Sequence, residues 1–434
     1  MNFDKICVLG LGYIGLPTAS TFATHGVRVV GVDVNPGIVE TLQNGGVHIH
    51  EPGLRTLVQA ALKSGNLSVS TQPEEADAFI IAVPTPFKDG KKADLSYVEA
   101  ASEAIVPFLR EDNLVLLEST SPPLTTLDVV APILEGSGLK AGDDFHLAYS
   151  PERVLPGQIL RELIENARIV GGIDQASAEA GRDLYTVFVR GEIICTDATT
   201  AEMVKLMENT YRDVNIAIAN EFSRLADHLG VDVWEAVTLA NRHPRVEILR
   251  PGIGVGGHCI GVDPWFLVEA APDLTPLIRT ARQVNDDQHR LVIELLQRGL
   301  GDLSDKRVTV LGLAYKPNVD DLRESPAVKA AQALVEAGAD VVAYEPFKKN
   351  ARLEGLTVTP NLDAALEGSD ALVLLVAHDP LLKLDPRQVA TMTPARLVVD
   401  AVNGWDPHPW QQAGFTVLRL GVGKPPSLPS EPPE

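Results

Sequence analysis

The sequence predicts an α/β protein built from two doubly wound domains, joined by a central helical region with one long helix. Two observations lead to this prediction. Short β-branched apolar runs alternate with Ala- and Leu-rich stretches in both halves of the chain, and a stretch without Gly or Pro separates the halves. Strands that alternate with helices form doubly wound layers. Runs that are apolar throughout suit strands buried on both faces of a parallel sheet.

Both halves carry the same order of apolar runs. In each half the runs end in Gly, Pro or acidic residues, and helical stretches lie between them. Because the order repeats, we expect two related α/β domains at the two ends of the chain. The runs are KICVLGLGYIGLP (5–17), VRVVGVDVNP (27–36), DAFIIAVPTP (77–86) and NLVLLESTSP (113–122), then RVTVLGLAYKP (307–317), ADVVAYEP (339–346), DALVLLVAHDP (370–380) and ARLVVDAVNG (395–404).

The stretch between the halves predicts the long helix. Residues 197–229 contain neither Pro nor Gly, and Gly230 follows them. Asp197 or Thr199 can cap the amino end, and a glycine just past the last turn is a common helix stop. About 30 helical residues would span ~45 Å. A helix of this length often connects domains and forms a dimerisation surface, so we expect a homodimer through it.

Length and composition bound the function. The chain has 434 residues, more than one ordinary core accommodates, so we expect two to three domains. No apolar run is as long as a membrane span, and the amino-terminal residues lack the basic region of a signal peptide. We therefore expect a cytoplasmic protein that does not bind membranes. The net charge of −21 argues against a nucleic-acid-binding surface.

The first half contains a dinucleotide-binding motif. Gly10, Gly12 and Gly15 follow a predicted strand in the pattern GxGxxG and precede a helical stretch. The first glycine permits a tight turn, the second lets a pyrophosphate approach the backbone, and the third lets helix and strand pack closely. Asp33 closes the second strand 18 residues after Gly15, where an acid binds ribose hydroxyls and disfavours a 2′-phosphate. The alternative is a purely structural turn, but the context favours a Rossmann-like NAD site.

Other strand ends supply further candidates. Thr85, Ser119 and Thr120 follow two apolar strands, and ligands of doubly wound sheets gather at the carboxyl ends of strands. We expect these residues on the nicotinamide side, although Thr and Pro also occur in ordinary turns. In the second half Lys316 stands where the motif would place a glycine. Lys316 and Arg323 would suit the phosphates of a second nucleotide, unless both are solvated surface charges.

The three cysteines differ in context. Cys7, Cys195 and Cys259 are widely spaced, and no CxxC or Cys/His spacing predicts a disulfide framework or a metal site. Cys7 and Cys195 resemble the small buried side chains that most cysteines are. Cys259 lies in the glycine-rich run GVGGHCIGVDPW (254–265), which has no helix or strand pattern. A nucleophilic thiol in this loop is favoured over buried filler, and it would need a cation or base nearby. The candidates for that group are His258, Lys205 and Asp263.

Polar residues on the long helix suggest the chemistry. Lys205, Asn209 and Arg212 are spaced i, i+4 and i+7, so they share one face of a largely apolar segment. A solvated stripe is the usual explanation, but polar groups on a buried helix need partners, and ligand oxygens would serve. An NAD site with a cysteine nucleophile suggests oxidation of an aldehyde through a thiohemiacetal and a thioester, with Lys205 and Asn209 holding the oxyanion. Two readings remain: an aldehyde-to-acid dehydrogenase, or a four-electron enzyme that starts from the alcohol.

Seven blocks of the sequence carry a resemblance to a known family. They are GLGYIGLP, VPTPF, ESTSP, SPERVLPG (150–157), AEMVKLMENTYRDVNIA (201–217), GVGGHCIGVDPWF and GLAYKPNVDDLRESP. In this order they resemble the UDP-glucose/GDP-mannose dehydrogenase family over nearly the whole chain. The resemblance implies two Rossmann-like domains joined by a helix that builds a dimer. It also implies oxidation of a sugar nucleotide at C6 to a carboxylate, with two NAD⁺ and no release of the aldehyde.

The resemblance also implies a class of substrate. The blocks GGHCIGVDPWF, NRHPRV and DDLRESPA are most similar to the branch that oxidises UDP-N-acetyl-D-mannosamine to the uronate, although Thr199–Thr200 stands where that branch has Arg-Thr. Val262 replaces a lysine of the UDP-glucose branch, which disfavours UDP-glucose. The alternative substrate is UDP-N-acetyl-D-glucosamine. A non-catalytic homologue would have lost the thiol or the Lys205/Asn209 pair, and both are present.

Roles are carried over by position in the matched blocks. Cys259 is similar to the nucleophile, and Lys205, with Asn209 beside it, to the acid/base or oxyanion stabiliser. Asp263 and Glu152 are similar to groups that orient water or protons, with Glu152 as the base for thioester hydrolysis; Thr120 completes the catalytic set. The implied substrate contacts are Lys205, Asn209, Arg153, Val154, Arg212, His243, Arg245, Gly256, Tyr315 and Lys316, and the implied cofactor contacts are Gly10, Gly12, Tyr13, Ile14, Gly15, Asp33, Thr85, Thr126 and Arg323.

The expected domains follow from these assignments. Residues 1–196 form the NAD-binding domain and residues 197–300 a central helical dimerisation domain with the catalytic loop. Residues 301–423 form the Rossmann-like domain for the UDP-sugar, and residues 424–434, rich in Pro, Ser and Glu, form a disordered tail. Near Thr126 the chain has Pro123-Leu124 where relatives usually have Val-Gly, so the local backbone is expected to differ there.

Overall fold

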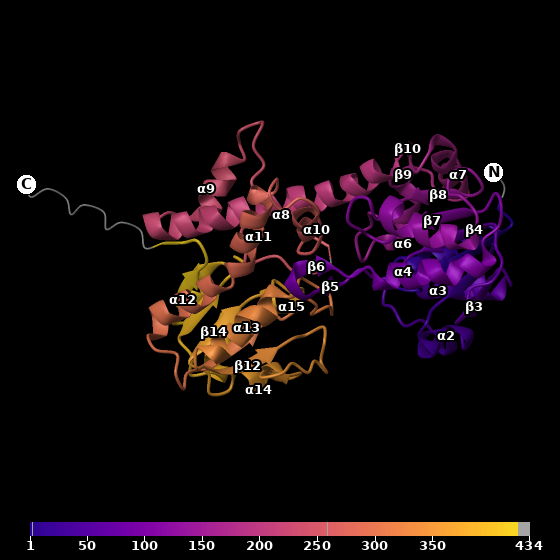
Figure 1. The fold of residues 1–434 in the computed structure, drawn as a ribbon. Coiled ribbons are helices and arrows are strands. Elements are labelled where there is room, and N and C mark those ends of the chain that lie inside the picture. The colour runs from indigo at the N-terminus through magenta and orange to yellow at the C-terminus, as the bar shows by residue number, and fades with distance from the viewer. Residues whose placement is uncertain (2, 258, 424–434) are drawn as a thin grey trace, which may run out of the picture. The chain divides into compact units, whose positions relative to one another are not determined.

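The structure, a computed structural model, describes the whole chain except residues 2, 258 and 424–434 (Figure 1). The predicted tail and His258 therefore lie outside the described residues. The described chain forms two compact units. The first contains Met1–Glu208 and Trp265–Pro272, and the second contains Asn209–Pro264 and the chain from Asp273 onward. The boundary falls within the long helix, so both units share the region that the sequence predicts as one central domain.

The first unit is an eight-stranded sheet in the order β10-β9-β8-β7-β4-β1-β2-β3. Neighbouring strands are parallel except β8 and β9, which pair antiparallel. The strands are β1 (Lys5–Leu9), β2 (Arg28–Val32), β3 (Leu67–Ser70), β4 (Ala78–Ile81), β7 (Leu114–Leu117), β8 (His146–Tyr149), β9 (Arg168–Gly172) and β10 (Ile193–Asp197), with a separate antiparallel ribbon of β5 (Phe87–Lys88) and β6 (Lys92–Ala93).

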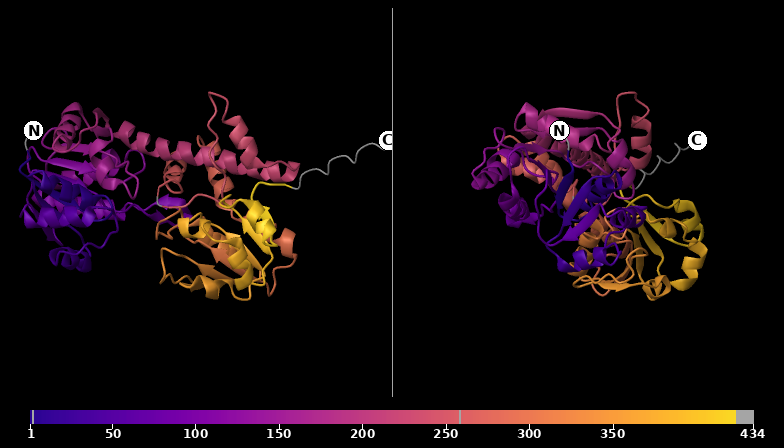
Figure 2. Two further views of the ribbon diagram at one scale, coloured as in Figure 1. Left: turned by 180° about the vertical axis from the view of Figure 1, so that it is seen from behind. Right: turned by 90° about the vertical axis from the view of Figure 1, so that its right-hand side faces the viewer.

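Helices cover both faces of this sheet, as Figure 2 shows from two further directions. On one face Leu16 and Phe22 pack with Val58 against the strands, and on the other face Val98 and Ile105 do so. Strands buried on both faces explain the continuous apolar runs of the sequence. The helices are α1 (Gly15–Thr24), α2 (Pro36–Gln43), α3 (Leu54–Lys63), α4 (Ser96–Ile105), α5 (Ala131–Leu134), α6 (Ile159–Glu165) and α7 (Gln175–Tyr185).

The second unit contains a six-stranded parallel sheet in the order β13-β12-β11-β14-β15-β16. Six consecutive strands of the first sheet, β3-β2-β1-β4-β7-β8, have the same order, so the predicted doubly wound repeat is confirmed. Two apolar cores, one with Leu295 and Leu334 and one with Val389 and Trp410, flank the strands. The strands are β11 (Arg307–Leu311), β12 (Asp340–Tyr344), β13 (Thr357–Thr359), β14 (Ala371–Leu374), β15 (Leu397–Asp400) and β16 (Thr416–Arg419).

Eight helices among the described residues belong to this second unit alone, and seven of them begin with a capping side chain or with Pro in the first turn. Several open with Pro in the first turn after a capping side chain; Ser325, for example, accepts a hydrogen bond from the backbone N–H of Ala327. The helices are α9 (Val233–Ala240), α11 (Pro276–Asp287), α12 (Arg290–Leu300), α13 (Pro326–Glu336), α14 (Leu362–Leu366), α15 (Asp379–Leu382), α16 (Pro386–Met392) and α17 (Pro407–Gln412).

The predicted long helix is α8, Ala198–Leu229, with 32 residues. Asp197 caps it: the backbone N–H and the hydroxyl of Thr200 donate to its carboxylate at 2.8 and 2.6 Å. Gly230 has φ +75° and ends the helix, as the sequence predicts. No helix among the described residues is long and apolar enough to cross a membrane.

Within the second unit, α8 and α11 are joined by buried polar side chains. Asp213 and Arg282 form an ion pair at 2.5 Å, and both are almost fully buried, with 0% and 1% exposure. Asn285 Nδ2 donates to Asp213 Oδ1 at 2.8 Å, and Asn220 Nδ2 donates to Asn285 Oδ1 at 2.9 Å. Asn220 Oδ1 in turn accepts from the backbone N–H of Gly252 at 2.9 Å. This network therefore holds two helices and the start of the glycine-rich run.

We expect Arg282→Met to lower the free energy of unfolding by about 3–5 kcal/mol, because Asp213 would stay buried without its cation. Adding Asp213→Asn should recover much of that loss, because both charges are then removed. The measurement is denaturant unfolding followed by circular dichroism. The control is Arg290→Met, whose ion pair with Asp287 is largely exposed. A loss in Arg282→Met no larger than in this control would contradict the prediction.

Candidate active site

The three motif glycines form the turn between β1 and α1. Gly10 has φ +92°, and a Cβ there would lie 2.5 Å from the carbonyl oxygen of Ala82. A Cβ on Gly15 would lie 1.8 Å from the Gly10 carbonyl oxygen, whereas a Cβ on Gly12 would meet nothing within 4 Å. Gly10 and Gly15 are thus required by the fold, and Gly12 faces open space at the amino end of a helix. That is the arrangement a pyrophosphate needs.

Asp33 lies beside this turn. Its Oδ2 accepts from the backbone N–H of Leu11 at 3.0 Å, and its Oδ1 accepts from the backbone N–H of Asn35 at 2.9 Å. The carboxylate is half-buried and reaches the turn from the carboxyl end of β2. Tyr13 is 39% exposed and Ile14 is half-buried on the same turn. The residues present therefore fit a dinucleotide.

The loops after β4 and β7 are joined to each other. The Thr85 hydroxyl donates to the Thr120 carbonyl oxygen at 2.6 Å, and the Ser119 hydroxyl donates to the Val83 carbonyl oxygen at 2.7 Å. Because β4 pairs with both β1 and β7, these loops lie at the same sheet edge as the glycine turn. Thr85 and Thr120 are half-buried there. The structure thus gathers the candidates at one edge.

The side chain of Thr126 does not lie where it could contact a cofactor. It is fully buried, and its hydroxyl and backbone N–H both donate to Glu202 Oε1, at 2.6 and 2.8 Å. Leu124 has φ +76°, and its N–H donates to Glu202 Oε2 at 2.6 Å. The backbone there adopts a conformation that glycine favours, although the residue is Leu. Glu202 was not among the residues that the sequence predicts, and the contact between Thr126 and the cofactor stays a prediction.

A buried group of charges lies at the carboxyl ends of β7 and β8. Arg168 donates to Glu118 Oε1 at 3.1 Å and also to Glu152 Oε2, while the Tyr185 hydroxyl donates to Glu118 Oε1 at 2.5 Å. Burial raises the pKa of Glu118 to about 7, against the opposing effect of Arg168. The pKa of the Arg168 guanidinium is raised, because the nearby carboxylates outweigh its burial. Of these residues, only Glu152 is predicted by the sequence.

The predicted nucleophile, Cys259, belongs to the second unit. It is exposed, and its carbonyl oxygen accepts from the backbone N–H groups of Val262 and Asp263 at 3.0 and 2.9 Å. These bonds place Cys259 one turn before α10, Asp263–Ala270. The amino end of a helix favours negative charge, which suits a thiolate. Val262 itself is buried, with 7% exposure.

The glycines around Cys259 allow its loop to lie against the segment after β11. A Cβ on Gly256 would lie 2.5 Å from the Glu324 carbonyl oxygen and 2.6 Å from Pro326 Cδ. A Cβ on Gly257, which has φ +84°, would lie 2.8 Å from the ring of Tyr315. The close approach therefore requires glycine at both positions. It brings Tyr315, a predicted substrate contact, beside the Cys259 loop.

Asp263 is fixed by the long helix. Asn209 Nδ2 donates to Asp263 Oδ2 at 2.5 Å, and Asp263 is 2% exposed. Lys205, one helical turn before Asn209, is also buried. The predicted side chains are thus divided: Lys205, Glu152, Thr120 and the glycine turn belong to the first unit, and Cys259, Asn209 and Asp263 to the second.

The other predicted substrate contacts are placed as follows. Arg153 forms an ion pair with Glu208 at 2.7 Å, and Val154 packs against the first core. Arg212, His243 and Arg245 are exposed. The last two lie on a loop that Asn241 closes by accepting from Ile248 N–H and donating to its carbonyl oxygen, at 2.7 and 2.9 Å.

In the second sheet, too, an acidic side chain binds the turn after the first strand. Glu345 directly follows β12, is fully buried, and accepts from the backbone N–H groups of Leu313 and Ala314 at 2.7 and 3.0 Å. His378 contacts the same oxygen at 3.1 Å. Lys316 lies over the Tyr315 ring at 5.6 Å. Arg323 forms an ion pair with Asp321 at 2.6 Å. Glu345 was missed, although it closes the second strand of its half just as Asp33 does.

The other two cysteines differ from Cys259. Burial raises the pKa of the Cys7 thiol to about 12, and burial also raises the pKa of Cys195. Neither is therefore suited to form a thiolate. Among the described residues, no group of His, Cys, Asp and Glu is arranged to hold a metal ion.

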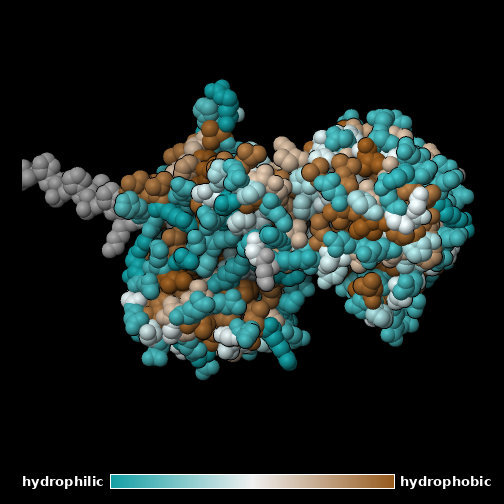
Figure 3. All heavy atoms as spheres, viewed as in Figure 1, coloured by the Kyte–Doolittle hydropathy of each residue, from teal (hydrophilic) through white to brown (hydrophobic). Residues whose placement is uncertain are grey.

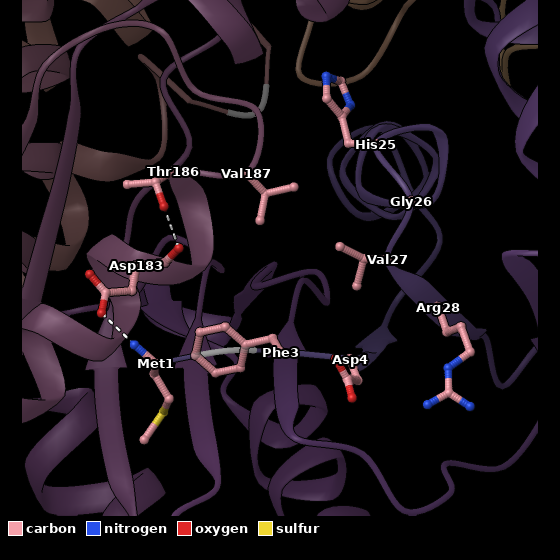
Figure 4. A pocket seen from close by; sticks show the side chains of 10 residues that line it. All are labelled: Met1, Phe3, Asp4, His25, Gly26, Val27, Arg28, Asp183, Thr186 and Val187. Carbon is pink, nitrogen blue, oxygen red and sulfur yellow. Dashed lines mark hydrogen bonds and ion pairs between the residues drawn. The ribbon is translucent and has the colours of Figure 1, made fainter.

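A hollow of about 670 Å³ lies elsewhere in the first unit (Figure 4). Its lining includes Phe3, Val27 and Arg28, at the amino ends of β1 and β2, and the amino group of Met1 pairs with Asp183 at 2.7 Å beside it. The glycine turn is at the carboxyl ends of these strands. This hollow is therefore separate from the predicted cofactor site.

The chain matches known proteins over nearly its whole length. Family models of the UDP-glucose/GDP-mannose dehydrogenase family match residues 4–189 (NAD binding domain), 199–287 (central domain) and 309–407 (UDP binding domain). A UDP-N-acetyl-D-mannosamine dehydrogenase of Methanococcus maripaludis is 48% identical over 433 residues, covering 97% of this chain and 98% of the relative. An NDP-N-acetyl-D-galactosaminuronic acid dehydrogenase of Ralstonia nicotianae is 49% identical, covering 93% of this chain and 97% of the relative.

Solved structures agree with these matches. A structure described as a UDP-D-ManNAc dehydrogenase from Pyrococcus horikoshii has a TM-score of 0.90 and 40% identity, covering 97% of this chain and 100% of the other. A UDP-N-acetyl-mannosamine dehydrogenase from Staphylococcus aureus has a TM-score of 0.87 and 42% identity, covering 96% of this chain and 99% of the other. The predicted fold, cofactor and family are confirmed. The chain belongs to the UDP-glucose/GDP-mannose dehydrogenase family and is an NAD-dependent dehydrogenase.

Proposed function

We propose that this enzyme oxidises C6 of UDP-N-acetyl-D-mannosamine to the carboxylate, giving UDP-N-acetyl-D-mannosaminuronate, a precursor for cell-surface polysaccharide. The observation that carries the proposal is the Cys259 loop, whose exposed thiol lies one turn before α10 and beside Tyr315. The names of the relatives at 48% and 40% identity support the sugar, and so does the buried Val262 next to Asp263.

The reaction divides into an alcohol oxidation and an aldehyde oxidation. NAD⁺ held at the glycine turn beside Asp33 would supply the hydride acceptor for both oxidations, so one sugar would reduce two NAD⁺. In the first, Lys205 or water held by Asp263 takes the hydroxyl proton. The Cys259 thiolate then adds to the aldehyde, and Lys205 and Asn209 stabilise the oxyanion of the thiohemiacetal. Loss of the second hydride leaves a thioester.

Hydrolysis of the thioester completes the reaction. Glu152 takes a proton from water as the water adds to the thioester carbon. The C–S bond then breaks, which releases the acid and returns the Cys259 thiolate. The buried position of Glu152 and its fixed hydrogen bonds suit a group that must orient one water. Three widely spaced cysteines outside disulfides suit a reducing compartment, and the proposal includes a cytoplasmic location.

The substrate is tested with purified enzyme, NAD⁺ and a panel of UDP-sugars. UDP-N-acetyl-D-mannosamine should give two NADH per sugar and the largest kcat/KM by at least about tenfold, because pocket shape distinguishes epimers. UDP-N-acetyl-D-glucosamine is the alternative, and the Ralstonia relative makes an N-acetylgalactosamine nucleotide a further member of the panel. A larger kcat/KM for either sugar nucleotide would show that the proposed substrate is wrong. A yield of one NADH per sugar would show that the reaction is not a four-electron oxidation.

The nucleophile is tested with Cys259→Ser. This variant should bind NAD⁺ and the UDP-sugar with unchanged affinity, because the thiol contributes little binding, yet release no acid. Titration calorimetry measures binding and chromatography measures the acid. Cys195→Ser is the matched control and should keep full activity, since that residue is half-buried in β10. Acid release by Cys259→Ser at the normal rate would remove Cys259 from the mechanism.

The proposal includes a homodimer through α8. Exposed apolar residues follow one another along this helix at spacings of three, four and seven, which places them on one face; they are Met207, Tyr211, Ile218, Phe222, Leu225 and Leu229. Figure 3 shows hydrophobic spheres gathered over α8 where it adjoins α9. Tyr211 is 74% exposed in the single chain, and an apolar face of this kind suits burial against a second copy.

The double variant Tyr211→Glu/Phe222→Glu should be monomeric, because two charges would be buried in the contact. Light scattering after size-exclusion chromatography measures the mass. Glu221→Lys, a charge change at an exposed neighbouring position, should leave the dimer intact. A dimer in the double variant would place the interface elsewhere.

A further inference from the structure

The group of charges around Arg168 contains one more carboxylate than the proposed reaction uses. It contains two carboxylates, Glu118 and Glu152, one guanidinium and one phenol, all nearly excluded from solvent. Among the described residues, Glu118 Oε2 is buried and has no hydrogen-bond partner. An unpaired buried carboxylate oxygen is costly, and such atoms in native proteins usually have a functional reason.

The topology of the sheet places this group at the catalytic edge. Glu118 directly follows β7, and Ser150 and Glu152 follow β8, so all three lie at carboxyl ends of parallel strands. Because β9 runs antiparallel to β8, the first residue of β9, Arg168, lies at that same edge. Tyr185 reaches it from the last residue of α7.

Arg168 is held rigidly. Its Nη1 donates to Glu118 Oε1 at 3.1 Å and to the Ser150 hydroxyl at 3.3 Å, and its guanidinium lies 4.0 Å from the centre of the Tyr185 ring. Its Nη2 donates to Glu152 Oε2. A planar guanidinium with three fixed neighbours has one orientation, which sets the direction of its remaining N–H bonds.

Glu152 is therefore oriented through both of its oxygens. Oε2 accepts from Arg168, and Oε1 accepts from the backbone N–H of Arg153 at 2.7 Å. We propose that Arg168, braced by Glu118 and Tyr185, is a positioning residue that holds the Glu152 carboxylate in the direction needed for thioester hydrolysis. The proposal rests on the proposed function, and it assigns Arg168 to the hydrolytic step rather than to either hydride transfer.

Glu118 gives the group a dependence on pH. The groups that face it are Arg168 from β9, Glu152 and Ser150 from the segment after β8, and Tyr185 from α7. Because burial raises its pKa to about 7, Glu118 changes charge within the pH range in which such an enzyme works. When Glu118 is protonated, Glu152 alone pairs with the positive charge of Arg168. When Glu118 is ionised, both carboxylates compete for that charge.

The test separates hydride transfer from acid release. Wild-type enzyme and Arg168→Met are mixed with NAD⁺ and UDP-N-acetyl-D-mannosamine, the NADH burst is followed by absorbance, and quenched protein is analysed by intact-mass spectrometry. Arg168→Met should keep the two-NADH burst, lose about 100-fold in steady-state turnover, and accumulate protein carrying the sugar nucleotide. Arg168→Lys should recover part of the turnover, because one charged donor returns. Arg182→Met, an exposed arginine on α7, should behave as wild type.

Glu118→Gln supplies a second readout. The pH profile of acid release in wild type should contain an inflection near pH 7 that this variant lacks. A carboxyl whose pKa is raised by folding favours the folded state at low pH, and this contribution is lost as pH rises through about 7. The melting temperature of Glu118→Gln relative to wild type should therefore be higher at about pH 8 than at about pH 5.

The outcomes distinguish the two proposals. If wild type makes no NADH from any UDP-sugar, the proposed function fails and the role of Arg168 fails with it. If wild type is active but Arg168→Met loses burst and turnover in equal proportion, without a protein adduct, Arg168 is structural and this inference alone is overturned. Should Arg168→Met be poorly folded, the pH profile of Glu118→Gln decides: an unchanged inflection overturns the inference, and a lost one supports it.

Discussion

The buried ion pair between Asp213 and Arg282 is the contact on which the path of the Cys259 loop depends. Through Asn285 it joins α8 to α11. The same helix pair holds the run before Cys259: Asn220 accepts from the N–H of Gly252, and a Cβ on Gly254 would lie 2.7 Å from the carbonyl oxygen of Asn285. Because both charges are almost fully buried and pair with each other, any other arrangement of the two helices would leave a buried charge without its counter-ion. A segment without helix or strand therefore has a defined path.

The same hydrogen-bond pattern occurs in both sheets. In each, an acid at the end of the second strand accepts backbone N–H groups from the turn after the first strand: Asp33 from Leu11, and Glu345 from Leu313 and Ala314. The carboxylates differ in their surroundings. Asp33 is half-buried and reachable, as an acid that binds ribose must be, whereas Glu345 is fully buried and also contacts His378. The two halves thus share a framework, while only the first keeps the open glycine turn that fits a dinucleotide.

Placing charge at the edge of a sheet follows from strand direction. Parallel strands bring Thr85, Thr120 and Glu152 to one edge because their carboxyl ends coincide. The antiparallel strand β9 adds Arg168 from its amino end. One reversed strand therefore supplies a rigid arginine where the carboxylates gather.

Much of the molecule was determined by local patterns that the sequence displays. Continuous apolar runs predicted the parallel strands of both sheets, Asp197 and Gly230 predicted the ends of α8, and the glycine spacing with Asp33 predicted the cofactor turn. These features depend on neighbours along the chain. Sequence context also singled out Cys259.

Only the tertiary structure decided what depends on residues distant in sequence. It turned the Thr126 hydroxyl to Glu202, gave Leu124 a glycine-like backbone, and brought Glu118, Arg168 and Tyr185 around Glu152. A lone Glu or Arg carries no local signal of burial or pairing, since its partner is chosen by strand order and helix packing.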